Sequence, residues 1–245
     1  MADLVLSDSL VDEYFKYKFG DKFDTNKMRK LLKYIQPFFL KDTHKFMSDP
    51  AMPMQLSSDP LIEIIDINND EELVQNSSLK LMVIDRHISA TYTTININVI
   101  DEKIGLRFGG IYPNSIEKNK AQKHIKALIS DGSYVKVSDS YIDSSDLQWE
   151  KNKEILRDII PYTMIDLVIE SGSVINRQSS LSGLKKAELE SFCIDWTVKA
   201  NQYNDRVKHD RYIETDKVKI LLSSGLYNLS SSSNKDFTYI VDLKY

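Results

Sequence analysis

The chain has 245 residues, of which 42% are apolar and 28% are charged, and its formal net charge at neutral pH is −4. This length allows two domains of moderate size, and the composition is typical of a globular protein. The acidic balance gives no reason to expect nonspecific binding to a nucleic acid backbone, although it leaves room for a local basic site. Cys193 is the only cysteine, which excludes an intrachain disulfide and a cysteine-based zinc site.

The N-terminal sequence MADLVLSDSLVDEYF lacks the basic segment and the unbroken apolar run of a secretion signal. No stretch approaches the roughly 20 apolar residues that span a bilayer. Together with the single cysteine, these features lead us to expect a cytoplasmic protein without a transmembrane segment.

The first part of the chain, residues 1–112, is expected to form an α+β domain. Apolar residues at helical spacing predict two helices within 8–35, separated at Gly20. Prolines predict an irregular connection over 36–60. The strands expected here are 61–67, 79–88 and 93–100, with 103–112 returning as the hairpin partner of the last and with a turn or hinge at Gly109 and Gly110. These residues indicate no role for the domain.

The second part, residues 113–245, alternates helices and strands with short connections, which is typical of a layered α/β domain. Helices are expected at 115–131, 147–161 and 181–203, and strands at 133–142, 162–172, 207–215, 217–225 and 237–245. The last strands can form an antiparallel end of the sheet. The expected fold class is therefore α/β, with an N-terminal α+β domain.

Three residues near the C-terminus form the strongest chemical pattern. His209, Arg211 and Asp216 follow the order His, any, basic, any four, Asp, and Ser223 and Ser224 come after six further residues. This pattern resembles the signature of the phospholipase D superfamily, a His, Lys and Asp motif followed by Gly, Ser, any, Asn. Ser224 matches the serine, whereas Arg211, Ser223 and Leu226 replace Lys, Gly and Asn. The resemblance covers about 116–245, where the order of helices and strands also resembles half of such a domain.

The resemblance implies phosphodiester chemistry that requires no metal and no other cofactor. A basic side chain neutralises the phosphodiester, one imidazole attacks phosphorus to form a phosphohistidine, and a second imidazole protonates the leaving oxygen. One motif supplies half of this site, so His209 would act with His209 of the partner subunit in a homodimer. Arg211 would then bind the phosphoryl oxygens and Asp216 would support the imidazole. The candidate catalytic residues are His209, Arg211, Asp216 and Ser224, and the candidate ligand-binding residues are Ser223, Asn228, Asp139 and Tyr141.

A similar single motif with a His-Asp-Arg triplet occurs in the phospholipase-D-like domain of a microtubule-interacting-and-trafficking protein of cell abscission. That resemblance implies a noncatalytic role in binding a membrane or a partner. The segment HDRYIET with a following SSG also resembles segments of bacterial proteins, several of them linked with antiviral defence.

The leading hypothesis is therefore a noncatalytic recognition and assembly module, one component of a bacterial defence system or another multiprotein system. Its expected partners are another protein or a second copy of the chain, and a phosphate-containing ligand such as nucleic acid or a lipid headgroup. The alternative is a metal-independent homodimeric phosphodiesterase or nuclease. A third interpretation treats the three residues as the face and turn of an ordinary hairpin.

A second match to the spacing, at His124, Lys126 and Asp131, falls in a helical pattern, where positions two apart point in different directions. We interpret it as a helix surface. His44, Asp85 and His87 have no third ligand at a recognisable spacing, so the sequence does not support a metal site.

Overall fold

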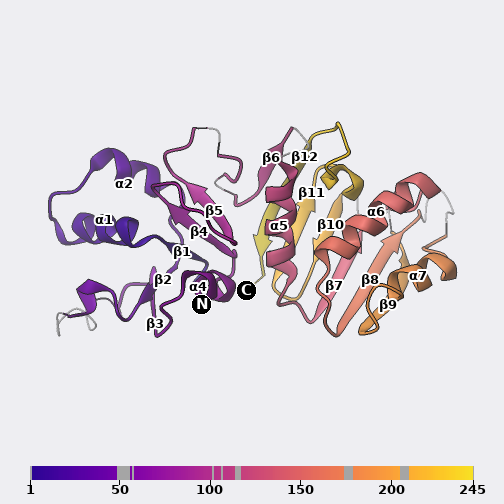
Figure 1. Ribbon diagram of the computed structural model, residues 1–245, viewed down its shortest axis with the longest axis horizontal. Coiled ribbons are helices and arrows are strands. Elements are labelled where there is room, and N and C mark those ends of the chain that lie inside the picture. Colours follow the sequence, from indigo (N-terminus) through magenta and orange to yellow (C-terminus); the bar gives the residue numbers. More distant parts are fainter. Residues whose placement is uncertain are drawn as a thin grey trace. The chain divides into compact units, whose positions relative to one another are not determined.

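A computed structural model describes residues 2–48, 56, 58–100, 102–105, 107–113, 117–173, 179–204 and 210–244. The chain divides into two compact units, Met1–Leu106 and Arg107–Tyr245, which are drawn in Figure 1. The division falls six residues before the expected boundary (106 against 112) because Gly110–Tyr112 pairs with a strand of the second unit.

The first unit contains a five-stranded sheet in which all described strand pairs are parallel. Its strands, in the spatial order β3-β2-β1-β4-β5, are β1 (Leu4–Leu6), β2 (Phe38–Lys41), β3 (Ile62–Ile65), β4 (Leu81–Ile84) and β5 (Thr93–Asn96). Its helices are α1 (Asp8–Phe19), α2 (Thr25–Leu31), the 3-10 helix η1 (Lys45–Ser48) and α4 (Asp70–Asn76).

Helices cover both faces of this sheet. On β2, the Phe38 ring packs edge to face on Tyr14 of α1, with 5.4 Å between the ring centroids. The next side chain, Phe39, lies in an apolar cluster with Leu73 and Val74 of α4. Successive strand side chains point to opposite faces, so α1 and α4 lie on opposite sides. Gly20 ends α1 with a left-handed φ of 79°, as the sequence predicted.

The expected hairpin at the end of the first unit is wrong. Strand β5 pairs in parallel with β4, whereas Gly110–Tyr112 forms β6 of the second unit. Gly110 thus begins a strand instead of forming a turn. Gly109 lies close against the backbone of that sheet. A Cβ added to it would stand 1.9 Å from the carbonyl oxygen of Tyr239. Only glycine permits such a close approach.

The second unit contains a seven-stranded mixed sheet in the order β6-β12-β11-β10-β7-β8-β9. The strands other than β6 are β7 (Tyr134–Ser138), β8 (Ile165–Ser171), β9 (Trp196–Gln202), β10 (Arg211–Glu214), β11 (Val218–Leu222) and β12 (Phe237–Leu243). The helices are α5 (Lys118–Ile129), α6 (Asp146–Ile159), α7 (Gly183–Glu190) and the 3-10 helix η2 (Leu226–Leu229). Strands β7, β8 and β9 are parallel and the others are antiparallel to their neighbours. The α/β class and the antiparallel end of the sheet are confirmed.

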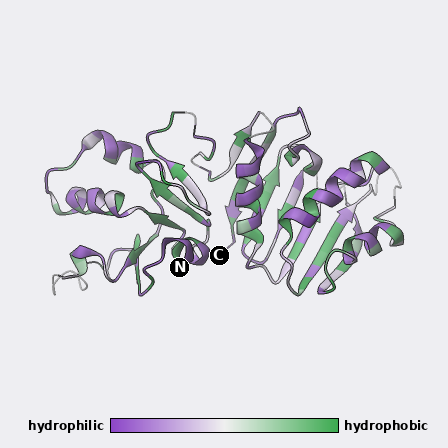
Figure 2. Cartoon of the chain, viewed as in Figure 1, coloured by the Kyte–Doolittle hydropathy of each residue, from purple (hydrophilic) through white to green (hydrophobic). Residues whose placement is uncertain are grey.

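In the second unit, α5, α6 and α7 lie on the same side of the sheet (Figure 1). Alternate strand residues such as Val135, Val137 and Ile213 have no exposed surface and form the core with these helices. Figure 2 shows the same division, with apolar strand residues and largely hydrophilic helix surfaces. Burial of this apolar face is the main force that holds the layers together.

The helix expected over 181–203 is partly wrong. Helix α7 ends at Glu190, and Trp196–Gln202 forms the edge strand β9. Trp196 and Val198 are buried whereas Thr197 and Lys199 are exposed, which is the period-two alternation of a strand with one buried face. The end of β9 therefore reaches the same edge of the sheet as the ends of β7 and β8.

Candidate functional site

Asp139 and Arg211 form an ion pair at the carboxyl edge of the parallel strands. Asp139 directly follows β7, and Arg211 begins β10, which runs antiparallel to β7 with Tyr212 opposite Ser138. This register brings the two side chains together, and Arg211 Nε donates to Asp139 Oδ1 at 3.1 Å. The guanidinium carbon also lies 5.6 Å from the centre of the Tyr141 ring. The structure therefore joins three of the residues that the sequence singled out.

Asp139 is held behind Arg211 and has no exposed surface. Burial raises the pKa of this carboxyl group, while the backbone N–H of Tyr141, the Arg211 guanidinium and the amide of Leu226 favour its charged form. Its Oδ2 is buried and makes no hydrogen bond of ordinary geometry with the described residues. Since Arg211 stands between this carboxylate and solvent, Asp139 acts as the support of Arg211.

Arg211 is the more accessible member of the pair. Its side chain keeps 30% of its surface exposed, against 1% for Asp139. Within the described part of the chain, the guanidinium makes one hydrogen-bonded ion pair, from Nε to Asp139, and its Nη groups make none. The two terminal Nη groups can therefore meet a ligand.

Two tyrosines fix Asp210, the residue before Arg211. Tyr203, which follows β9, donates its hydroxyl to the backbone oxygen of Asp210 at 2.7 Å, and Tyr212 donates to the Asp210 carboxylate at 3.0 Å. Burial is the main cause that raises the pKa of Tyr203 to about 12. Sequence reasoning missed Tyr203 and Asp210 because it read β9 as helix. A strand over 196–202 would have placed Tyr203 at this edge.

His209 lies outside the described residues, as do 205–208 before it. Its role in catalysis, and its pairing with His209 of the partner subunit, stay predictions.

Asp216 lies at the opposite end of the β10–β11 hairpin from Arg211. Strand β10 alone separates Arg211 from Glu214 by about 10 Å at 3.4 Å per residue, and Asp216 follows in the turn. There its carboxylate accepts a hydrogen bond from the backbone N–H of Ser133 at 3.1 Å. The structure thus places Asp216 as a support of the turn, away from the Arg211–Asp139 pair.

The serines after β11 return the chain to the edge where Arg211 lies. Ser223 is exposed and, with Asp210 and Arg211, lines a small pocket of about 130 Å³. Ser224 Oγ donates to the backbone oxygen of Asp236 at 3.4 Å. Asn228 is buried and its Oδ1 accepts a hydrogen bond from Ser233 Oγ at 2.8 Å. Ser223 is therefore the candidate with an open approach, whereas Asn228 holds a loop.

The second match to the motif lies on a helix, as predicted, but not entirely on its surface. His124 and Lys126 belong to α5. His124 has no exposed surface, and its Nδ1 lies 2.7 Å from the hydroxyl of Tyr239. Its ring is thus turned into the core, while Asp131 lies beyond the end of α5. The three side chains form no joint site.

Within the described ranges, no group of three or more His, Cys, Asp or Glu side chains is arranged to hold a metal ion. None of the helices described in this structure has the length and apolar character needed to cross a membrane. No protein-family model matches the chain, and no curated protein sequence matches it.

Proposed function

We propose that the second unit is a phospholipase-D-like recognition module that binds a phosphate-bearing ligand through Arg211 and does not cleave it. The observation that carries this proposal is the state of Arg211, whose Nε donates to the buried Asp139 while its side chain keeps 30% of its surface exposed. A guanidinium binds two phosphate oxygens through parallel N–H groups, and its prior fixation reduces the entropy lost on binding.

Two features favour recognition over catalysis. Leu226, which replaces the Asn of the phospholipase D signature, has no exposed surface and offers no polar side chain. Arg211, which replaces the Lys, already uses its Nε–H in a hydrogen bond to Asp139, so this group is not available to a substrate. The site therefore has fewer groups to stabilise a phosphoryl transition state than the family signature provides.

We further propose that the module works with a protein partner or a second copy of the chain, in the cytoplasm, as part of a bacterial defence system or another multiprotein system. The lone Cys193 supports a reducing compartment. The single motif supports pairing with a second chain, because a two-histidine site needs two motifs.

Calorimetric titration of the full chain with pyrophosphate tests the binding part. We expect binding that weakens at higher salt and falls at least about tenfold in Arg211→Ala, since a hydrogen-bonded charge pair is lost. Lys186 of α7, a cation whose side chain is 41% exposed and pairs with a carboxylate as Arg211 does, serves as a matched control, and Lys186→Ala should bind as the wild type does. Equal affinity of wild type and Arg211→Ala would contradict the proposal.

A cleavage assay with a chelator present tests the noncatalytic part. The substrates are single-stranded DNA, RNA and bis(p-nitrophenyl) phosphate. We expect no turnover by the wild type. Turnover that persists in chelator and disappears in His209→Ala would instead establish the homodimeric phosphodiesterase.

A further inference from the structure

A groove between α5 and α6 lies apart from the Arg211 site. It measures about 440 Å³ and is lined by Asn119, Gln122, Lys123, Lys126, Arg157, Asp158 and Tyr162. Helix α5 leads into the start of β7, and Tyr162 precedes the start of β8. The groove therefore opens toward the amino edge of the parallel strands, whereas Arg211 lies at the carboxyl edge. Its volume is within the range of about 300–1,000 Å³ of small-molecule sites.

The lining is basic although the chain as a whole is acidic. Three cationic side chains face one carboxylate, that of Asp158. Helix α5 has the sequence KNKAQKHIKALI, with four lysines and no acidic residue. Like charges three residues apart on a helix repel each other, so these lysines do not stabilise the helix. An anion bound beside it would relieve the repulsion.

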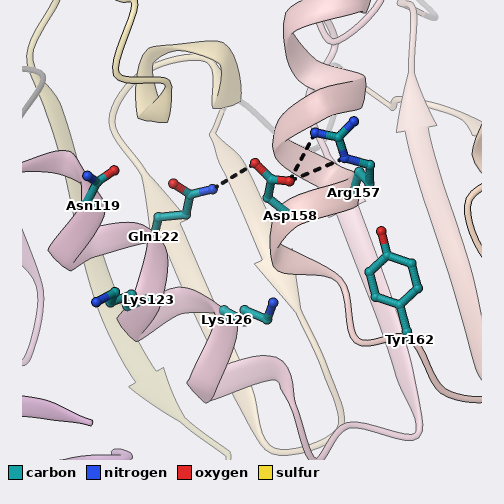
Figure 3. A pocket seen from close by; sticks show the side chains of 7 residues that line it. All are labelled: Asn119, Gln122, Lys123, Lys126, Arg157, Asp158 and Tyr162. Atoms are coloured by element: carbon teal, nitrogen blue, oxygen red, sulfur yellow. Dashed lines mark hydrogen bonds and ion pairs between the residues drawn. The ribbon is translucent and has the colours of Figure 1, made fainter. Parts of the chain in front are cut away.

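The lysines of the groove are available to a ligand. Neither Lys123 nor Lys126 forms an ion pair or a side-chain hydrogen bond with the rest of the described chain. Figure 3 shows the Lys126 side chain extending from α5 toward α6, whereas the Lys123 side chain points to the other side of α5. Arg157 is instead engaged by Glu154 at 2.5 Å and by Asp158 at 3.3 Å. Lys126 is thus the cation with the best access to the groove.

Tyr162 supplies an aromatic wall. Tyr162 is 53% exposed, and its ring packs on Trp196 in a tilted arrangement with 5.6 Å between the ring centroids. Trp196 is itself anchored by its Nε1 donating to the backbone oxygen of Pro161 at 2.8 Å. A ring that is supported on one neighbour and is largely exposed is suited to stacking on a planar base.

Polar groups for the edge of such a ligand line the same groove, and Figure 3 shows Gln122 and Asp158 side by side across it. Gln122 Nε2 donates to Asp158 Oδ2 at 3.4 Å, a long bond that a ligand can replace. Asn119 adds a second amide. Amide and carboxylate groups together offer donors and acceptors to a sugar or a base edge.

We propose that the groove between α5 and α6 binds the phosphate and base of a nucleotide, with Lys126 on the phosphate, Lys123 adding positive charge nearby, and Tyr162 stacked on the base. The same chemistry is present in a free mononucleotide and in a nucleotide unit of a single-stranded nucleic acid.

The test follows the indole N–H signal of Trp196 by NMR in the full chain, during titration with adenosine monophosphate. Adenosine and inorganic phosphate are titrated separately. The nucleotide is expected to shift the Trp196 signal and to bind at least about tenfold more tightly than either part alone. Binding of the nucleotide without any change at Trp196 would overturn the proposal.

The variants are chosen on exposed positions. Lys126→Glu and Lys123→Glu/Lys126→Glu should weaken binding at least about tenfold, and so should Tyr162→Ala. Tyr162→Phe keeps the ring and should bind as the wild type does. The control Lys22→Glu/Lys33→Glu makes the same charge change on exposed lysines of the first unit and should leave binding intact. Equal losses in this control and in the groove variant would show a mere charge effect and contradict the site.

Two further comparisons separate this site from the proposed function and identify the ligand source. Arg211→Ala should keep the nucleotide response at Trp196, so failure of one site does not imply failure of the other. A short single-stranded oligothymidylate that competes with the mononucleotide and binds more tightly identifies nucleic acid as the source. If the mononucleotide binds more tightly, the natural ligand is the free nucleotide. If neither the mononucleotide nor the oligothymidylate binds, the proposal is overturned.

Discussion

The Nε of Arg211 donates to Oδ1 of Asp139 across 3.1 Å and ties the start of β10 to the end of β7, the strand with which it pairs antiparallel. The carboxylate is fully buried, whereas the guanidinium remains partly solvated. The pair thus serves both the fold and the proposed phosphate site.

Mutation of this pair should show strong coupling. Asp139→Asn leaves Arg211 without its counter-ion, and Arg211→Met leaves a buried carboxylate without a cation. We expect each change to lower the free energy of unfolding by about 1–3 kcal/mol, less than for a fully buried pair because Arg211 is partly exposed. Urea unfolding of both single variants and the double variant measures the coupling. Strictly additive losses would mean that the pair contributes nothing as a pair.

The pH dependence of Arg211→Met should follow Asp139. Burial already raises the pKa of this carboxyl group in the presence of Arg211, and loss of the cation raises it further. A group whose pKa is higher in the folded state binds more protons when folded, so its contribution to stability falls as pH rises. The deficit of Arg211→Met relative to the wild type should therefore shrink as pH falls toward about 4, the unfolded value for Asp. Urea unfolding at several pH values measures it, and a constant deficit would argue against this origin.

Glu214 should have the opposite pH dependence. Its burial acts to raise the pKa, but hydrogen bonds from Lys136 and Lys244 outweigh burial and lower the pKa to about 2; both contacts measure 2.7 Å. A lowered folded pKa gives stability that is present above about 4.3, the unfolded value, and is lost as pH falls toward 2. Glu214→Gln should thus be less stable than the wild type by about 1–3 kcal/mol at neutral pH. The two unfolding curves should converge near pH 2, and a gap that persists there would refute this role.

Gly109, near the start of the second unit, and Gly105, near the end of the first, provide a matched pair of glycines. A Cβ at Gly109 would collide with the backbone of Tyr239, whereas a Cβ at Gly105 meets nothing within 4 Å. Gly109→Ala should therefore disturb the pairing of β6 with β12 and lower the thermal midpoint by several degrees, about the effect of 1–3 kcal/mol. Gly105→Ala should change it little. Similar midpoints for the two variants would contradict the close approach at Gly109.

The sequence was most informative where one face of an element is buried. Alternation over Val218–Leu222 and Phe237–Leu243 predicted β11 and β12, and the helical stripe at Ala121, Ile125 and Leu128 predicted α5. Such periodic patterns reflect local geometry, so a single sequence reveals them.

The missed elements depend on contacts far away in the chain. Strand β1 has three residues, too few to show a period, and its neighbours β2 and β4 come 32 and 75 residues later (38 − 6 and 81 − 6). Strand β6 was assigned to the first unit because its partner β12 lies near the other end of the chain. When a strand pairs with a distant part of the chain, the residues next to it in the sequence do not reveal its partner.

The site was predicted in part for the same reason. Arg211 and Asp139 were singled out separately, but only the pairing of β10 with β7 shows that they touch. The motif spacing gave Asp216 a place beside His209 and Arg211, whereas the hairpin carries it to the far turn. Residues at fixed spacing meet at one site only if the backbone between them allows it.

The NMR signal of the Arg211 Nε–H group during titration with pyrophosphate tests most directly whether Arg211 binds phosphate. We expect one Arg Nε–H signal, absent in Arg211→Lys, that is protected by Asp139 in the free protein and shifts in proportion to the ligand bound. In Asp139→Asn, the same signal should broaden and the affinity should fall. An Arg211 signal that does not respond to a saturating phosphate ligand would contradict the assignment of this edge of the sheet as a phosphate-binding site.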